Sequence, residues 1–482
     1  MLDKFKDDIN FSSIYLAAAQ YNGVDQFADA LSVSALASKD CNPIILVSAT
    51  MNEDTVSIIK SKVDKDSKVI AIGGTSLVSE NIVTSVVNVN SSGENDKQDN
   101  PKKPSSGGGG GGGSSRSNPF AGGNGTVSSP YKIANAAQLN KVRNYLSKNF
   151  ILTADIDLSS YANWEPIGIF NPQAGDEAGY FVNAFKGSFD GDNHTISNLT
   201  TNKKDSVGVG LIGTASSSSI VKDVEMKNVT AEGTMSVGAV VGYNKGIVEN
   251  LTLSGDNTIS GYNCIGGILG GNDEGTIKNC TAVATINVLG DNIFEDGKYI
   301  LPDNAECGGI IVGGSFGGTI DGCSSEGVVN SKGSNAMGLG GVGGCLENMT
   351  SITNCNANVT INAGESAHGV GGLCGFSGTF DRENPAKISN CKIIVTINGK
   401  NATHTAALVG TGLYMNKYDM ESVFTISNCE VQGSINDAVT PETVVGRAEG
   451  STIESCTVDV TIDGVSDGAE IGTTDRLFES AE

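Results

Sequence analysis

Thr276-Ile-Lys-Asn-Cys280 is the stretch that decides the fold, because its pattern returns throughout the rest of the chain. Five further copies end in Cys323, Cys355, Cys391, Cys429 and Cys456, and three earlier copies end in Leu199, Val224 and Leu251. Cysteine therefore occupies a position that aliphatic residues also fill. Neighbouring copies lie 25 to 43 residues apart, a spacing that indicates a protein built from stacked structural repeats.

Two more segments accompany the motif in each repeat. A glycine-bounded apolar segment such as Gly267-Ile-Leu-Gly270 precedes it, and an alternating segment such as Ala284-Thr-Ile-Asn-Val288 follows it. Each repeat thus holds about three short strands separated by Gly, Asn or Asp corners. We predict a mainly β fold, a right-handed parallel β-helix of about nine coils, with each coil about 4.8 Å above the last.

The motif cysteines are expected to form an inward column that continues the aliphatic one. Free cysteine behaves as a small hydrophobe and is among the most buried residue types. A metal site would need ligands that converge on one point, whereas a column directs every sulfur the same way in different layers. Disulfides between adjacent layers are conceivable but would strain that arrangement. Four other cysteines lie beside the glycine segments and are expected in a neighbouring column: Cys264, Cys307, Cys345 and Cys374.

Composition divides the chain into three parts. Residues 1–88 alternate short apolar runs, at 12–19, 42–48 and 67–74, with two segments of helical periodicity, at 27–39 and 52–63, which predicts a small α/β module with a parallel sheet. Residues 89–127 are rich in Gly, Ser and Asn, contain Gly107–Gly113, and are predicted to be a flexible linker. Residues 128–482 are predicted to form the β-helix.

The overall charge excludes several classes of function. The chain has a net charge of −23 with 31 Lys and Arg residues, so it has no basic face for nucleic acid or an anionic membrane. No apolar run approaches the roughly 20 residues that span a bilayer, and the N-terminus lacks the apolar region of a secretion signal. Either the chain is cytoplasmic or its leader has been removed, and an extracellular setting fits the composition better.

Motifs that suggest chemistry have simpler structural interpretations. Gly208-Val-Gly-Leu-Ile-Gly213 fits a nucleotide-binding pattern, but it is one of the recurring glycine corners, and no crossover helix follows. Asp190-Gly-Asp-Asn-His194 suits a tight turn better than calcium binding or acid–base catalysis. We expect no cofactor and no metal. Parallel β-helices often carry polysaccharide lyases or glycosidases, so a carbohydrate-active enzyme remains the alternative.

The repeat region resembles the GLUG-motif family, named for a Gly-Leu-hydrophobic-Gly core that stands here as Gly210-Leu-Ile-Gly213. Its opening, residues 134–170 followed by 185–199, is similar to the lead-in of such arrays, and the resemblance covers about 128 to 465. Members similar to this occur in large bacterial surface proteins, adhesins and non-catalytic parts of secreted proteases. The resemblance therefore implies display at a surface more than any reaction.

Residues 12–86 resemble the type-2 cell-wall-binding repeat of Gram-positive surface proteins, through Phe27–Ser32, Leu36-Ala37, Pro43–Leu46 and Ile72–Gly74 with Val78-Ser79. In that family three repeats pack together and hold an anionic secondary cell-wall polymer. The resemblance makes Pro43, Ile44, Ile45 and Leu46 candidate contacts with this polymer, while a buried central strand is the other interpretation. One repeat is visible, so the chain is expected to be part of a longer precursor, the product of a split gene, or a trimer.

We therefore expect a non-catalytic, secreted protein of the Gram-positive cell wall, with an anchor, a tether and a β-helix that serves adhesion or surface-layer structure. A wall-tethered lyase or glycosidase and a purely architectural spacer are the competing interpretations. A host glycan or matrix protein would contact the insertions at 171–183, 291–306, 332–338, 378–386 and 412–422. The candidate aromatic contacts there are Tyr180, Phe181, Tyr299, Phe380, Tyr414 and Tyr418.

Overall fold

The computed structural model describes two compact units, which divide at Gly113 and Ser114. In the first unit it describes 13–18, 20–21, 24–25, 43–47 and 68–72. In the second it describes 118–471 except for 171–182, 291–306, 333–335, 349, 366, 379–385, 411–423, 440, 443, 447–451 and 468–469. The predicted helices at 27–39 and 52–63, and residues 89–117 of the predicted linker, lie outside these ranges.

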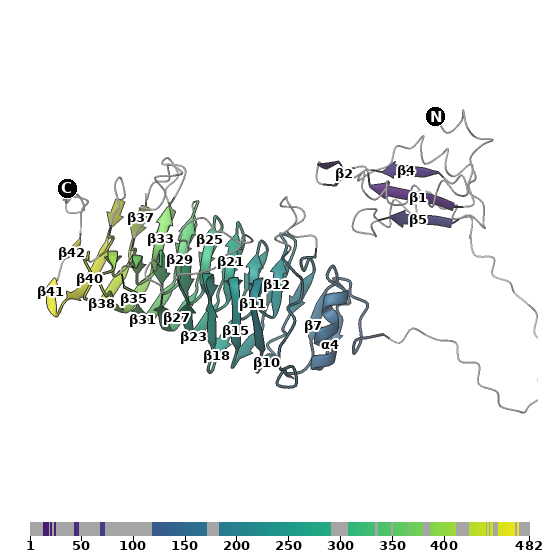
Figure 1. Cartoon of the computed structure of the whole chain (residues 1–482), viewed down its shortest axis with the longest axis horizontal. Coiled ribbons are helices and arrows are strands. Elements are labelled where there is room, and N and C mark those ends of the chain that lie inside the picture. The colour runs from purple at the N-terminus through teal and green to yellow at the C-terminus, as the bar shows by residue number, and fades with distance from the viewer. Residues whose placement is uncertain are drawn as a thin grey trace, which may run out of the picture. The chain divides into compact units, whose positions relative to one another are not determined.

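The first unit contains a parallel three-stranded sheet, as the alternating sequence pattern predicts. The strands are β1 (Ser13–Ala18), β4 (Ile44–Val47) and β5 (Lys68–Ile72), and β1 lies between the other two (Figure 1). The short strands β2 (Gln20–Tyr21) and β3 (Val24–Asp25) pair antiparallel. Ile14 and Leu16 of the central strand are completely buried.

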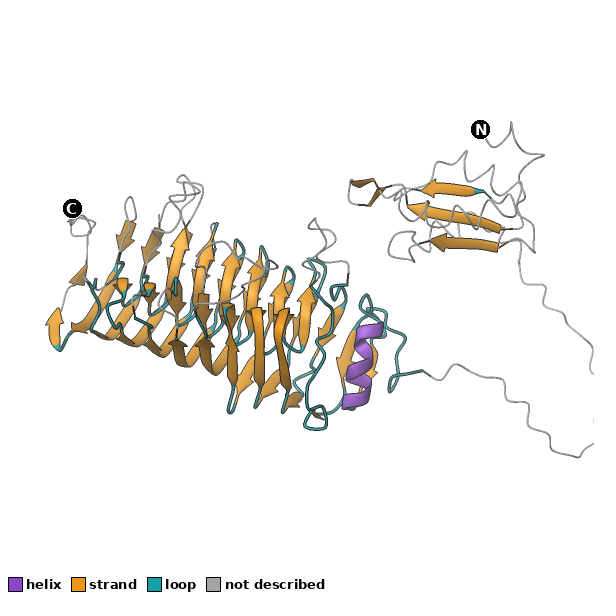
Figure 2. Ribbon diagram, viewed as in Figure 1, coloured by secondary structure: helices purple, strands orange, loops and turns teal. Residues whose placement is uncertain are grey.

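The second unit is a β-helix whose coils contribute strands to three curled parallel faces (Figures 1 and 2). Sheet 1 holds the short motif strands. In spatial order they are β6 (Tyr131–Ile133), β7 (Phe150–Leu152), β9 (Ser188–Asp190), β13 (Ile220–Lys222), β17 (Ile247–Glu249), β22 (Thr276–Lys278), β26 (Thr319–Asp321), β30 (Ser351–Thr353), β34 (Ala386–Ser389), β37 (Phe424–Ser427) and β39 (Thr452–Glu454).

Sheet 2 follows the motif in each coil and forms the longest face. Its first row comprises β8 (Ile156–Asp157), β10 (Thr195–Ser197), β14 (Glu225–Lys227), β18 (Thr252–Ser254), β23 (Thr281–Val288), β27 (Ser324–Ser331), β31 (Asn356–Asn362), β35 (Lys392–Asn398), β38 (Glu430–Asn436) and β40 (Cys456–Ile462). Its second row comprises β11 (Thr200–Val209), β15 (Thr230–Val237), β19 (Thr258–Gly261), β20 (Asn263–Gly266), β24 (Cys307–Gly309), β28 (Gly338–Gly340), β32 (His368–Gly371) and β36 (Thr403–Ala406).

Sheet 3 follows the glycine segments and closes each coil. It comprises β12 (Ile212–Ala215), β16 (Val241–Asn244), β21 (Leu269–Asp273), β25 (Val312–Phe316), β29 (Gly343–Glu347) and β33 (Cys374–Gly378). Glycine is needed here because the backbones of successive corners approach closely. A Cβ on Gly313, for example, would lie 2.2 Å from the backbone of Cys264. The prediction of a mainly β, β-helical fold is confirmed.

The inward side chains form ladders in register from coil to coil. Ile277 pairs with Ile320, Ile320 with Ile352 and Ile352 with Ile388, and all four are at most 1 % exposed. The six motif cysteines behave in the same way, since each is a free thiol and none is more than 5 % exposed. The predicted inward column of packing cysteines is confirmed.

Left-handed backbone at the residue before the cysteine turns the chain from sheet 1 into sheet 2. The φ angles are 51° at Asn279, 64° at Gly322, 55° at Asn354 and 55° at Asn390. Asn and Gly adopt this conformation at low cost, which accounts for the recurring Asn before Cys. The carboxamides also bond along the column, as when Asn390 Nδ2 donates to Asn354 Oδ1 at 3.1 Å.

The structure corrects one alignment made from the sequence. The sequence pattern predicts Leu199 in the column of Val224, but Val221 pairs with Phe189, and Ile196 pairs with Met226. Thr200 pairs with Thr230, so Leu199 stacks on Val229 in a different column. The error arose because the early coils have two left-handed corners, and an asparagine followed by an aliphatic residue marks the second corner as well as the first.

Two of the cysteines outside the motif are joined covalently. Cys307 and Cys345 form a disulfide between consecutive coils, with a Cα–Cα separation of 5.5 Å. Cys264 lies one coil before Cys307, in register with it. It is a free thiol, and so is the buried Cys374. The prediction that all four of these cysteines share one neighbouring column is therefore wrong, because Cys345 and Cys374 lie on sheet 3.

Additional elements contact the first and last coils of the β-helix. At the N-terminal end α4 (Ala136–Lys141), capped by Asn135, and the 3-10 turn η2 (Val142–Asn144) bury Leu139 and Val142 against the first coil (Figure 2). At the other end β41 (Val465–Asp467) and β42 (Glu470–Ile471) pair antiparallel with β40. In the described ranges, no helix is long and apolar enough to cross a membrane.

The folded part begins before residue 128, within the segment assigned from composition to the linker. Phe120 is 4 % exposed, and its ring stacks on Tyr131 at a centroid distance of 4.5 Å. The ring of Phe150 approaches the Phe120 ring edge-on, at a centroid distance of 5.5 Å. One aromatic residue thus orders a segment whose glycines and asparagines otherwise indicate a flexible chain.

Candidate functional site

Three of the candidate polymer contacts lie in β4, at one edge of the described sheet of the first unit, and Pro43 directly precedes this strand. The carbonyl oxygen of Pro43 accepts a hydrogen bond from Tyr15 N at 3.0 Å, and Pro43 itself is buried. Ile45 is 8 % exposed and is a core residue, whereas Ile44 is half-buried. Of the three described side chains, Ile44 alone is not buried. The side chain of Leu46 lies outside the described atoms, and the role of all four residues as contacts stays a prediction.

The aromatic candidates cannot be placed. All of 291–306 and 412–422 and most of 171–183 and 378–386 fall outside the described residues. So do all the proposed aromatic contacts: Tyr180, Phe181, Tyr299, Phe380, Tyr414 and Tyr418. They remain predictions. Within 332–338, residues 332 and 336–338 are described, and Ala336 and Met337 are buried, so this part of the insertion belongs to the core.

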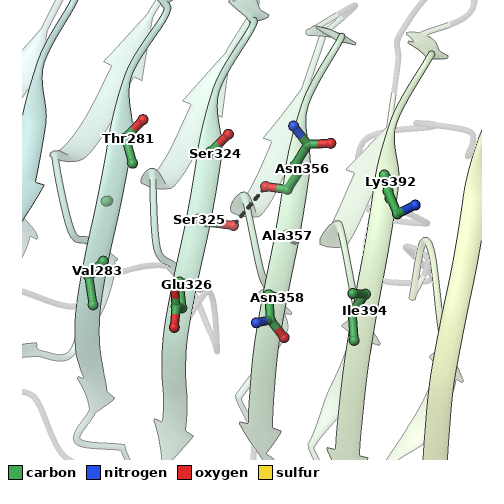
Figure 3. A pocket seen from close by; sticks show the side chains of 11 residues that line it. Thr281, Val283, Ser324, Ser325, Glu326, Asn356, Ala357, Asn358, Lys392 and Ile394 are labelled. Atoms are coloured by element: carbon green, nitrogen blue, oxygen red, sulfur yellow. Dashed lines mark hydrogen bonds between the residues drawn. The ribbon is translucent and has the colours of Figure 1, made fainter.

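A shallow groove of about 260 Å³ lies on the outer face of sheet 2, across β23, β27, β31 and β35 (Figure 3). Two rows of outward side chains border it, and Figure 3 shows them running from strand to strand. One row consists of Thr281, Ser324, Asn356 and Lys392, and the other of Val283, Glu326, Asn358 and Ile394. The strands are in register, so corresponding side chains occupy equivalent positions in successive coils.

The polar groups of this groove differ from those elsewhere on the same face. In the column that ends each strand, asparagines bond to one another, with Asn330 donating to Asn287 at 3.1 Å and Asn362 to Asn330 at 2.9 Å. By contrast, within the described part of the chain, no protein group hydrogen-bonds to the side chains of four groove residues. These are Thr281, Ser324, Asn356 and Asn358.

The groove carries little net charge. Its cation, Lys392, is paired with Glu430 of the next coil at 2.8 Å, which leaves Glu326 as the acidic group of the lining. Its two large aliphatic residues are unusually exposed for their type, Val283 at 37 % and Ile394 at 44 %. The surface therefore combines hydrogen-bonding groups without protein partners and apolar contacts in one hollow.

Acidic residues near the start of the β-helix are engaged with neighbouring coils. Lys222 contacts Asp190 at 2.8 Å and Asp223 at 2.7 Å, and these two carboxylates raise the pKa of the lysine well above its usual value. The ammonium group in turn lowers the pKa of Asp223, and Asn250 adds a second hydrogen bond to the same carboxylate. This cluster is a stacking interaction between coils.

The segment Asp190-Gly-Asp-Asn-His194 forms the predicted turn. Asp192 and Asn193 have φ angles of 47° and 62°, and Asp192 N donates to Asp190 Oδ1 at 2.9 Å. His194 Nδ1 lies 3.1 Å from Asp155 Oδ1, which also accepts from Thr195 N. That backbone bond, with the His194 contact, lowers the pKa of Asp155. Among the described residues, no group of three or more His, Cys, Asp or Glu side chains is arranged to hold a metal ion.

Burial raises the pKa of two ionisable groups on sheets 2 and 3. Burial raises the pKa of Cys264 to about 12, and the charge of Glu347 adds to the effect. Burial also raises the pKa of Glu347. The free thiol stacked beside the disulfide is therefore a poor nucleophile at neutral pH.

Comparison with known families confirms both resemblances. Residues 3–83 match Cell wall binding domain 2 (CWB2), and residues 261–287 and 335–362 match the GLUG motif. These segments define a protein with a cell-wall-binding module and surface-type repeats. The wall-binding match associates the chain with the cell wall.

Individual relatives match parts of the chain. Over 153 residues it is 37 % identical to Halomucin of Haloquadratum walsbyi. This alignment covers 31 % of this chain and 2 % of that protein. Over 147 residues it is 36 % identical to a protein of Evansella cellulosilytica that is named a Gly-rich membrane protein. This alignment covers 28 % of this chain and 16 % of that protein. The chain thus spans a small fraction of the length of these curated relatives.

Solved structures provide a more distant comparison. A Bacteroides ovatus chain described as an immunoglobulin A1 protease aligns with a TM-score of 0.37 and 19 % identity, over 74 % of this chain and 85 % of that one. A chain named IgA1 Protease aligns with a TM-score of 0.39 and 14 % identity, over 72 % and 25 %.

Proposed function

We propose that the protein is a non-catalytic component of the cell surface, anchored without a covalent bond to an anionic polymer of a Gram-positive wall. The match of residues 3–83 to the wall-binding family carries this proposal. The β-helix provides a stiff body because successive coils are joined by parallel ladders on three faces. It serves adhesion to a host glycan or matrix protein, or the structure of a surface layer.

The arrangement of acidic residues supports the non-catalytic part of the proposal. Glycosidic cleavage needs two carboxyl groups that face one another across a sugar, with one held as an acid. Several described carboxylates instead bond to the adjacent coil, as when Asp321 accepts from Thr353 Oγ1 and Asn354 Nδ2, both at 2.7 Å. Incubation of the full chain with pectic, mucin and wall polysaccharides is expected to release no reducing ends or unsaturated products. Sustained release would overturn this part.

Sedimentation with purified cell walls tests the anchor. The full chain is expected to pellet with Gram-positive sacculi and to stay in the supernatant once hydrofluoric acid has removed their anionic polymers. Ile44→Ala, on the half-buried position of β4, should weaken pelleting. Ile247→Ala is the matched control, because Ile247 is 39 % exposed and belongs to the β-helix, not to the wall-binding module. Equal pelleting before and after extraction would contradict polymer anchoring.

A further inference from the structure

We infer that the groove across β23, β27, β31 and β35 binds a neutral oligosaccharide. The first reason is its unused hydrogen-bonding capacity. Two hydroxyl and two carboxamide side chains face the hollow without protein partners in the described ranges, although other asparagines on this sheet bond to one another. Together they offer both donors and acceptors, as the hydroxyl groups of a sugar require.

The apolar residues of the groove fit the same ligand. Val283 and Ile394 stand at opposite ends of one row and are among the exposed large hydrophobic residues of the chain. A pyranose ring presents C–H groups on its faces and hydroxyl groups at its rim, so it can contact aliphatic side chains and hydrogen-bond at the same time. Binding sites for small molecules generally combine apolar surface with a few polar groups in this way.

The dimensions favour a chain of sugars over a single one. The groove crosses four strands, and three spacings of a parallel sheet amount to about 14 Å. Each coil repeats a polar side chain at the same position, as Thr281, Ser324 and Asn356 do. A linear glycan lying along the axis of the β-helix would therefore contact about one of these polar side chains for each sugar.

Charge and backbone geometry disfavour other ligands. An anionic glycan or nucleic acid would meet Glu326 and a strongly acidic chain, and the lysine at the groove is already paired with Glu430. An extended peptide cannot add to the sheet here, because the backbone groups of these strands are used within the parallel ladder. The ligand must be recognised by side chains.

Calorimetric titration of the full chain tests the inference, with cellohexaose, chitohexaose, mannohexaose and xylohexaose as neutral probes. At least one is expected to bind. The double variant Asn356→Ala/Asn358→Ala, which removes two exposed carboxamides, should weaken that binding about thirtyfold through the loss of two neutral hydrogen bonds. Gln432→Ala is the matched control, because Gln432 follows Ile394 in register one coil beyond the groove, and it should leave the affinity unchanged.

Three outcomes would overturn the inference: no binding of any probe at millimolar concentration, equal weakening by the double variant and Gln432→Ala, or preferential binding of oligogalacturonate or of an extended peptide. Thermal unfolding of each variant confirms that the fold is intact, and Ile394→Ser provides a second groove variant. The wall-sedimentation assay separates this inference from the proposed anchor, since the groove variants should pellet normally with sacculi and Ile44→Ala should still bind the oligosaccharide.

Discussion

Substitution of Asn354 tests the left-handed corner between sheets 1 and 2. Asn354 has a φ of 55°, donates to Asp321 Oδ1 at 2.7 Å and accepts from Asn390 at 3.1 Å. Asn354→Gly removes these two exposed bonds and keeps the backbone conformation, as Gly322 does one coil earlier. This variant should lower the free energy of unfolding by about 1–2 kcal/mol. Asn354→Val adds left-handed strain of about 1–2 kcal/mol, giving about 2–4 kcal/mol in total.

Urea unfolding followed by circular dichroism measures both free energies, and amide hydrogen exchange in β30 and β31 shows whether the loss is local. Asn358→Val is the control, because the same exchange in the middle of a strand should change the free energy of unfolding by less than about 0.5 kcal/mol. Equal destabilisation by Asn354→Gly and Asn354→Val would refute the corner as the reason for the recurring asparagine.

Further predictions concern the core, the disulfide and pH. Cys355→Val should change stability by less than about 1.5 kcal/mol, because Val224 fills the same kind of position, whereas Cys355→Asp buries a carboxyl group and should unfold nearby coils; thermal unfolding distinguishes these results. Cys345→Ala opens a link over a sequence separation of 38 residues and should lower the free energy of unfolding in urea by up to about 4 kcal/mol; no change under non-reducing conditions would contradict this. Hydrogen bonds from a hydroxyl and a carboxamide of the next coil lower the pKa of Asp321, so its contribution to stability is present above the unfolded-state pKa near 4 and is lost as pH falls through the lower folded-state value. Melting temperatures between pH 7 and pH 2 should therefore fall less steeply for Asp321→Asn than for the wild type.

The sequence reveals the β-helix because its constraints repeat. An isoleucine that must face inward, an asparagine that must turn left-handed and a cysteine that must fill a small apolar position lie within four consecutive residues, as in Ile277 to Cys280. The order of these three positions is the same in successive coils, although insertions of different lengths separate the coils. The same logic failed at Leu199, where a second corner carries the same residue types and only the pairing of Thr200 with Thr230 reveals the register.

The groove and the disulfide could not be predicted in the same way. The groove depends on four side chains being left without partners when coils stack, and each of them looks like an ordinary polar strand residue in sequence. The disulfide joins Cys307 on sheet 2 to Cys345 on sheet 3, so two cysteines on different faces had to be placed in space before their proximity was visible. Phe120 likewise needed its aromatic neighbours to show that the preceding segment is folded.

Distances along sheet 1 test the stacking of coils most directly. Spin labels carried by unnatural amino acids, which spare the native thiols, would be placed at Ser188 and at one of Ser351, Thr425 or Thr452, all outward positions in one register. These partners lie five, seven and eight strands away, so pulsed electron paramagnetic resonance should give distances centred at about 24, 34 and 38 Å. Distances that do not increase in this order, or that are spread without a maximum, would contradict a continuous parallel stack.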